Sequence, residues 1–201
     1  MKHQLLGALC LLLSFTGLAQ TAGKASPARL SDRLTYKVQI DFQGFTLPFS
    51  KLDRYTQNKG ITLGAYYNWN HSGSWQQGLS VGAFFNQFHG STQHLSTTLQ
   101  YNPLNTRHLL AGISLGAGYM RTGFTKGGWH QGPDGWFQKA NRKGLLFVPA
   151  AIQAGVRAFR NEKLTITPVV SYQVNALFNY TPDSFIIPQS IISIGSRFNL
   201  R

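Results

Sequence analysis

The sequence predicts an all-β protein: an eight-stranded antiparallel up-and-down transmembrane β-barrel preceded by a cleaved signal peptide. The first observation is the alternation between Leu34 and Phe42, where even positions are apolar and odd positions are polar. Period two is typical of a strand with one dry face and one wet face. The second observation is that later segments repeat this pattern. The third is that aromatic residues recur at the segment ends, as they do in lipid-facing barrel walls.

Residues 1–19 have the features of a secretory signal peptide, with a basic start, an apolar run over 5–18 and small residues before Gln20. The apolar run is shorter than the ~20 residues that a membrane-spanning helix needs, and no later segment reaches that length. Membrane residence therefore requires a barrel. Cys10 is the only cysteine, and Leu9 before it argues against a lipoprotein signal. We expect residues 20–33 to form a periplasmic N-terminal segment and residues 34–201 to form the barrel domain.

The predicted strands cover 34–42, 61–70, 79–88, 93–101, 108–121, 144–159, 164–178 and 191–200. Their even number suits a bacterial barrel. The connections after the second, fourth and sixth strands are short, and those after the first and fifth are long, which predicts a periplasmic N-terminus and extracellular long loops. We expect residues 102–105 to form a turn, and Pro182–Asp183 to lie in a loop. Pro149 and Pro168 each remove a ladder donor, so we expect β-bulges at both.

The parity and direction of the strands sort the outward aromatic residues into two girdles. The periplasmic girdle contains Tyr36, Trp69, Tyr101 and Phe198, and the extracellular girdle contains Phe42, Phe85, Tyr119 and Phe178. Amphipathic rings are enriched at membrane interfaces. A soluble barrel or sandwich would instead carry charges on its outer face. The predicted outward faces carry no charge at membrane level, which favours the transmembrane interpretation.

Wet-face parity predicts a lumen charge network of Lys37, Asp41, Arg157 and Arg197. An eight-stranded barrel is just wide enough for side chains to fill it, and charges inside need partners or water. We expect barrel closure to bring Arg197 beside Lys37, and Asp41 to anchor the cluster through the bidentate fork of Arg197. Two hypotheses remain open for these residues: a structural network, or an anion site with a narrow anion path.

The longest connection, 122–143, predicts a basic and aromatic extracellular loop, with Lys126, Trp129, Trp136, Phe137, Lys139, Arg142 and Lys143. The whole chain has 19 Lys and Arg residues against 6 Asp and Glu, a balance that favours anionic surroundings. We expect contact with outer-membrane lipids, including lipopolysaccharide, or with envelope polysaccharide. A specific envelope protein partner is the alternative. We expect no nucleic-acid partner.

The pattern of polar residues argues against an enzyme. A hydrolase acting on lipid would need a nucleophile, a base and an acid at membrane level, but parity turns only Thr97 and Ser196 outward and turns His94 and His108 inward. The sequence shows no metal-ligand spacing and no phosphate-binding glycine motif. We therefore expect no enzymatic activity and no cofactor. A partner-binding subunit of a larger envelope complex and a lipid-modifying barrel enzyme remain the alternatives.

Three features resemble the small outer-membrane β-barrel proteins common in Bacteroidetes: the leader ending Leu18-Ala19-Gln20, the eight alternating segments, and the terminal strand IISIGSRFNLR. The resemblance covers residues 34–201. It implies a barrel in the bacterial outer membrane and says little about function. The terminal strand also looks like the assembly signal that the barrel-insertion machinery reads, with Phe198 as its aromatic residue.

Overall fold

The computed structural model describes residues 33–44, 58–70, 72–86, 90–123, 128–132, 135–139, 142–161, 164–181 and 184–200. The predicted leader and most of the segment 20–33 lie outside these ranges. The strands are β1 (Leu34–Gly44), β2 (Lys59–Asn68), β3 (Trp75–Asn86), β4 (Gly90–Asn105), β5 (Leu109–Gly123), β6 (Gly128–Gly132), β7 (Gly135–Lys139), β8 (Arg142–Val156), β9 (Phe159–Arg160), β10 (Leu164–Thr181) and β11 (Ser184–Leu200). None of the described residues belongs to a helix long and apolar enough to cross a membrane.

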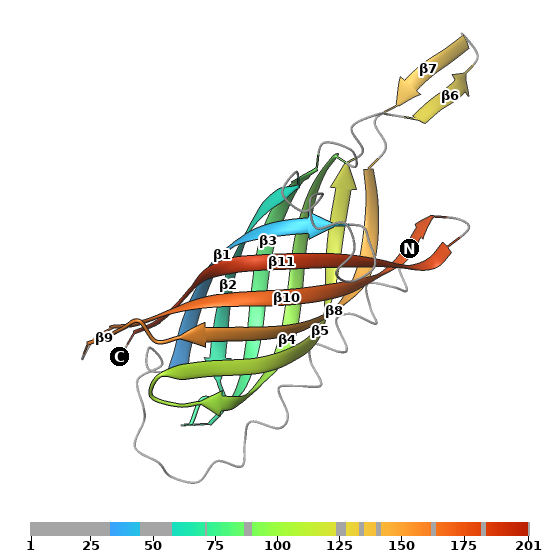
Figure 1. Cartoon of the computed structure of the whole chain (residues 1–201). Helices are drawn as coiled ribbons and strands as arrows, with labels where there is room; N and C mark the ends of the chain where they lie inside the picture. Colours follow the sequence, from blue (N-terminus) through green and yellow to red (C-terminus); the bar gives the residue numbers. More distant parts are fainter. Residues whose placement is uncertain are drawn as a thin grey trace.

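The strands form a closed antiparallel barrel (Figure 1). Hydrogen-bonded neighbours follow the order β11-β1-β2-β3-β4-β5-β8-β10, and β10 pairs with β11 to close the ring. β9 continues the line of β8 after a break at 157–158, so the wall has eight strands. β6 and β7 form a separate hairpin beyond one end of the barrel. The predicted eight-stranded antiparallel barrel is confirmed.

The register shows how strongly the strands are staggered. Direct partners lead from Gln39 through β2, β3 and β4 to Met120 on β5. In the other direction they lead from Gln39 through β11, β10 and β8 to Leu110, also on β5. The ring therefore closes with a stagger of ten residues, from Leu110 to Met120. Such a stagger tilts the strands by roughly 40° from the barrel axis.

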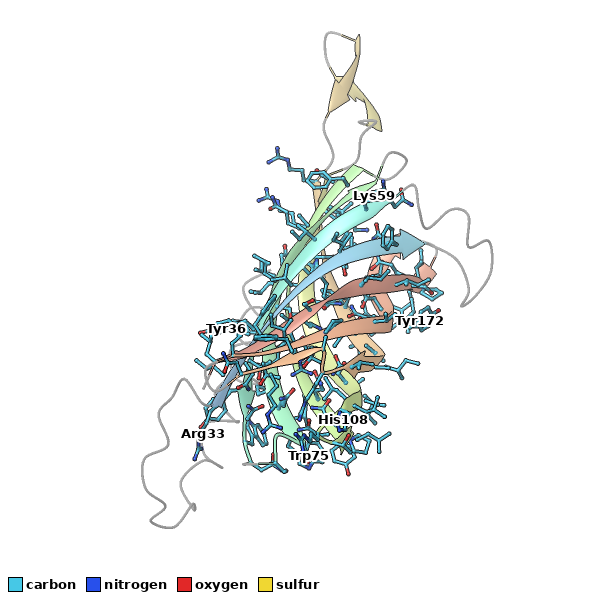
Figure 2. The ribbon with its side chains drawn as sticks, turned by 60° about the vertical axis from the view of Figure 1, so that its left-hand side comes forward. Arg33, Tyr36, Lys59, Trp75, His108 and Tyr172 are labelled. Carbon is cyan, nitrogen blue, oxygen red and sulfur yellow. The ribbon has the colours of Figure 1, made fainter. Side chains whose placement is uncertain are left out.

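The two ends of the barrel differ. The turn end carries the short connections 69–74, 106–108 and 161–163, and the loop end carries the connections 45–58, 87–89 and 182–183 and the β6–β7 hairpin. Figure 2 shows Arg33, Trp75 and His108 at the turn end and Lys59 at the loop end. The difference between the two ends agrees with the one predicted from the lengths of the connections.

The outer surface is apolar and the interior is largely polar. Ile40, Leu79, Leu115 and Ile152 are among the large aliphatic side chains that stand exposed on the outer wall. Gln39, Gln100 and Asn175 are among the polar side chains buried inside. In water this apolar surface would stay exposed, at a cost in free energy. An apolar belt around a closed barrel is therefore suited to a lipid bilayer.

Residues 102–105 continue β4 and do not form the predicted turn. The register with β5 shifts between Tyr101 and Leu104, which marks a β-bulge. Asn102 explains the difference: its backbone N–H donates to Ser74 O at 2.7 Å and its side-chain amide donates to Gly73 O at 3.2 Å. These bonds hold the segment against the neighbouring 72–74 turn and keep it extended.

Two strands begin earlier than predicted. β3 starts at Trp75, where the residues predicted as a turn pair with β4 up to Tyr101. β11 starts at Ser184, because the segment before Ile191 pairs with β10 as far as the Thr181–Ser184 pair, with a register shift after Phe178. The connection between β10 and β11 lies at 182–183, as predicted.

The two strand prolines behave differently. At Pro149 the pairing of β8 with β5 is interrupted, but the register before and after it is unchanged, so the expected bulge is absent. At Pro168 the neighbouring strand carries the irregularity. The partners Val169–Gly155 and Ile166–Phe159 differ in register by one residue, so the three residues 156–158 lie opposite Thr167 and Pro168.

Candidate functional site

The lumen contains a cation cluster near the turn end. Lys37 on β1 and Arg197 on β11 are direct partners, as barrel closure predicted. Tyr66 on β2 contacts both: Lys37 Nζ lies 5.0 Å and Arg197 Cζ 5.2 Å from the centre of its ring. The Tyr66 hydroxyl also hydrogen-bonds with Lys37 and Ser80. The negative face of an aromatic ring attracts cations, so Tyr66 offsets part of the repulsion between the two charges.

Inward glycines make room for the Tyr66 ring. A Cβ atom on Gly78 would lie 2.4 Å from Tyr66 Cε1, and one on Gly64 would lie 3.0 Å from Tyr66 Cε2. Phe147 uses the same arrangement, because a Cβ atom on Gly118 would lie 2.4 Å from its ring. Gly64, Gly78 and Gly118 are therefore positions where large lumen side chains lie against the wall.

Amide side chains hold both arginines of the predicted network. Arg197 is 4% exposed and its Nη2 donates to Gln76 Oε1. Arg157, in the break between β8 and β9, donates through Nη2 to Asn105 Oδ1. The Asn105 amide in turn donates to Ser72 O at 2.5 Å. These contacts tie the guanidinium groups into the walls at the turn end and favour the structural interpretation of the network.

Asp41 does not anchor this cluster. It is 2% exposed, and its carboxylate accepts hydrogen bonds from the hydroxyls of Thr62 and Ser193. In the part of the chain that the structure describes, Asp41 and Arg197 form no ion pair. The expected fork fails because the direct partner of Asp41 is Ser193, while Arg197 lies opposite Lys37 and reaches Gln76.

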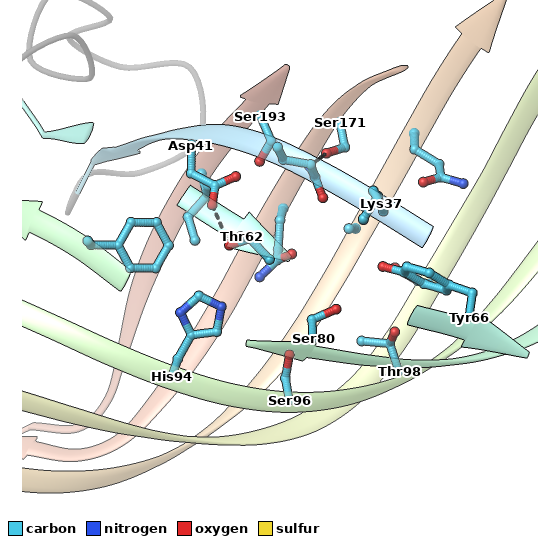
Figure 3. Close-up of a pocket in the computed structure, with 17 residues that line it drawn as sticks. Lys37, Asp41, Thr62, Tyr66, Ser80, His94, Ser96, Thr98, Ser171 and Ser193 are labelled. Atoms are coloured by element: carbon cyan, nitrogen blue, oxygen red, sulfur yellow. Dashed lines mark hydrogen bonds between the residues drawn. The ribbon is translucent and has the colours of Figure 1, made fainter. Parts of the chain in front are cut away.

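A small polar cavity of about 30 Å³ lies between the cation cluster and Asp41 (Figure 3). Its walls carry many hydroxyl groups, from Thr62, Ser80, Ser96, Thr98, Ser114, Ser171 and Ser193. Gln39 Nε2 donates to one of them, Ser171 Oγ, at 3.0 Å. The volume holds about two water molecules, and the polar walls supply the partners that buried waters need. The cavity is too small for a larger solute.

An apolar layer fills the lumen toward the loop end. The rings of Phe84 and His94 stack with centroids 5.1 Å apart, and Phe147 meets His94 edge-on at 6.1 Å. The buried side chains of Met120, Leu145, Phe147 and Leu177 form one cluster in this layer. Our sequence analysis did not single out this layer, although strand parity places Leu145 and Phe147 on the inward face.

Basic residues stand at the loop end of the wall. Arg121, Arg142 and Lys59 are exposed and Lys143 is half-buried. Of the predicted loop residues, Lys126 lies outside the described ranges. Trp129, Trp136, Phe137 and Lys139 lie in the β6–β7 hairpin, which pairs Trp129 with Gln138 and Trp136 with Gln131.

The predicted girdle residues lie on the outer wall near the two ends. At the turn end, Tyr36, Trp69 and Tyr101 are exposed and Phe198 is half-buried; at the loop end, Phe85 and Tyr119 are exposed and Phe42 and Phe178 are half-buried. The structure adds Trp75, whose ring lies 4.7 Å from that of Tyr101, and Phe185, whose ring lies 5.9 Å from that of Phe178. Both were missed because their strands begin earlier than predicted.

The polar groups on the outer wall pair with one another. Gln77 Nε2 donates to Thr97 Oγ1 at 2.6 Å, and the Tyr172 hydroxyl donates to Ser190 Oγ at 3.2 Å. His94 is buried in the lumen as predicted, whereas His108 is exposed in the 106–108 turn, outside the strand that was predicted to begin there. Among the described residues, no three His, Cys, Asp or Glu side chains gather where they could hold a metal.

The closed antiparallel barrel matches known structures. Neisserial surface protein A aligns with a TM-score of 0.54 and 9% identity, covering 83% of this chain and 95% of that chain. The chain has the fold of the small bacterial outer-membrane β-barrels. The attachment invasion locus protein Ail of Yersinia pestis aligns with a TM-score of 0.44 and 14% identity, covering 82% of this chain and 95% of that chain. The N-terminal barrel domain of Pseudomonas aeruginosa OprF aligns with a TM-score of 0.43 and 13% identity, covering 81% of this chain and 96% of that chain.

No protein-family model matches the chain, and no curated protein matches it. These comparisons bear on the barrel and leave the Bacteroidetes origin untested. The outer-membrane barrel fold and the apolar belt together place the protein in the bacterial outer membrane. The chain therefore has the outer-membrane barrel architecture that the sequence predicted.

Proposed function

We propose that the protein is a non-enzymatic, non-conducting outer-membrane barrel whose loop end contacts anionic lipid or polysaccharide of the envelope. The observation that carries this proposal is the filled lumen. Tyr66 adjoins the hydroxyl-lined cavity on one side, and Phe84 and His94 adjoin it on the other. With side chains packed above and below a space for about two waters, hydrated ions lack a continuous path.

The exposed Arg121, Arg142 and Lys59 support the contact with anionic lipid, because all three stand at one end of the apolar belt. Polyanionic surroundings attract such residues. Lipopolysaccharide is the outer-membrane lipid that we expect there. The barrel-insertion machinery remains the expected assembly partner, through the β11 strand that carries Phe198.

A second candidate function is binding of an envelope protein partner. Phe185 is 70% exposed on the part of β11 that extends toward the loop end, and Ile186 beside it is also exposed. The ring of Phe178 on β10 packs against Phe185. Large exposed apolar groups at the end of a barrel favour contact with another protein. A pull-down from native membranes, compared between wild type and a Phe185→Ser variant, tests this candidate.

Wild-type protein in planar lipid bilayers is expected to show no sustained conductance, because the lumen layers leave no continuous water path. Insertion is verified in the same preparation by protection of the barrel from added protease. A stable anion-selective current would overturn the filled-lumen proposal and make Lys37, Arg157 and Arg197 pore residues.

The proposed orientation predicts which connections a protease reaches. Protease added to intact cells should cut within 122–143, at the loop end, and should spare 160–163, at the turn end. Disruption of the outer membrane before protease treatment is the control, and it should expose both sites. Cutting of intact cells at 160–163 alone would show that the barrel is inserted the other way.

A further inference from the structure

We propose that Tyr119, Arg121 and Arg142 form a binding site for a phosphate group of an outer-leaflet glycolipid. The site lies on the outer wall of the barrel, at the loop end of β5 and β8, and is called the β5–β8 phosphate site below. This inference rests on the proposed orientation, in which the loop end faces the outside.

The register brings the two arginines together on one face. Arg121 on β5 lies directly opposite Gly144 on β8, and Arg142 lies opposite Gly123. Both arginines are exposed, and they are diagonal neighbours across the strand pair. Such neighbours stand roughly 7–8 Å apart, a span that two long guanidinium side chains can close around one phosphate.

Gly144 lies between these residues on the outer face, and Tyr119 lies over it. A Cβ atom on Gly144 would lie 2.0 Å from Tyr119 Oη, so the phenol hydroxyl occupies the space that a side chain would take. The direct partner of Tyr119 is Leu146, so its ring leans along the wall toward the loop end. The register therefore places the Tyr119 hydroxyl and the two arginine positions around Gly144.

The charges of the site are available for an anion. In the part of the chain that the structure describes, neither Arg121 nor Arg142 has a hydrogen-bond or ion-pair partner, and Asp41, inside the lumen, is the only carboxylate. Planar guanidinium groups favour phosphate because each can donate two parallel hydrogen bonds. The phenol supplies a further donor.

The depth of the site fits a lipid headgroup. The exposed Leu146 beside Tyr119 belongs to the apolar belt, and Arg121 comes two residues later along β5, toward the loop end. Aromatic rings mark the interface between hydrocarbon and headgroups. The next strands around the ring, β10 and β11, are apolar at the same end, where Phe185 and Ile186 are exposed.

The test uses the full chain in nanodiscs of phosphatidylcholine, titrated with bisphosphorylated lipid A, with enzymatically dephosphorylated lipid A, or with phosphatidylglycerol. Bound lipid is counted by native mass spectrometry after mild release from the disc. Wild type is expected to retain one lipid A and to bind it at least about tenfold more tightly than the dephosphorylated form, because the charge-assisted hydrogen bonds go to the phosphate.

The variant Arg121→Gln/Arg142→Gln should lose this preference. The matched control, Arg107→Gln/Arg160→Gln, removes the same number of exposed positive charges at the turn end and should change the affinity by less than about twofold. Circular dichroism checks that each variant forms the barrel. Equal losses in both double variants, no loss in either, or equal binding of phosphatidylglycerol and lipid A would overturn the β5–β8 phosphate site. The conductance and protease experiments test the proposed function separately, since neither depends on these arginines.

Discussion

Leu115→Arg is expected to destabilise the membrane-inserted barrel by about 2–4 kcal/mol, the cost of a cation facing hydrocarbon near the bilayer midplane. Leu115 stands in the middle of β5 and is 60% exposed on the outer wall, between its partners Leu99 and Ala150. The guanidinium group of an arginine at this position would lie far from both membrane interfaces. Reversible urea unfolding in phosphatidylcholine vesicles, followed by tryptophan fluorescence, measures the loss.

Leu109→Arg is the matched control, on the same strand. Leu109 is 52% exposed on the outer wall, but it lies at the turn end, opposite Val156. A charge near the interface costs only about 0–1 kcal/mol. If Leu115→Arg were as stable in vesicles as wild type, the outward belt of β5 would not face lipid. A loss of the same size in both variants would show that the cost is independent of depth, which contradicts the assigned membrane level.

The architecture could be predicted because each strand repeats one simple rule. A shift of the strand register by one residue would turn every apolar side chain of that strand inward. The alternation therefore fixes which face meets lipid. The alternation around Val38 and Ile40 is enough to place Lys37 and Asp41 inside. The pairing of Lys37 with Arg197 followed from closure of the first strand on the last. These inferences need only local pattern and chain direction.

Strand ends and lumen contacts could not be predicted in the same way. The start of β3 at Trp75 and the bulge after Tyr101 depend on hydrogen bonds between Asn102 and the 72–74 turn, which join residues far apart in the sequence. The choice of Gln76 as the partner of Arg197 spans 121 residues. Parity shows which side chains enter the lumen, but the ten-residue stagger decides which of them meet.

Tyr66→Ala is expected to destabilise the barrel by about 3–5 kcal/mol, the range for removing a large buried ring. The ring fills the space over Gly64 and Gly78 and contacts both Lys37 and Arg197. Its removal leaves a cavity and also leaves two directly paired cations without the aromatic face. Urea unfolding in vesicles measures the loss.

Two further variants separate the contributions of the ring. Tyr66→Phe keeps the face toward both cations and loses only the hydroxyl bonds with Lys37 and Ser80, so about 1–2 kcal/mol should be lost. Lys37→Met in the Tyr66→Ala background removes one of the two cations, and it should recover part of the loss. In the wild-type background the Tyr66 ring already offsets the repulsion between the cations. Lys37→Met should therefore be less favourable for stability there than in the Tyr66→Ala background.

This double-mutant cycle decides what Tyr66 does, because the coupling energy reports the interaction and cancels the cost of the cavity alone. A coupling of about 1–2 kcal/mol between Tyr66 and Lys37 fits a desolvated cation held against an aromatic ring. A coupling near zero would mean that the ring serves only as packing. The partners that neutralise Lys37 and Arg197 would then be the amide and hydroxyl groups around them, with Gln76 as the first to test.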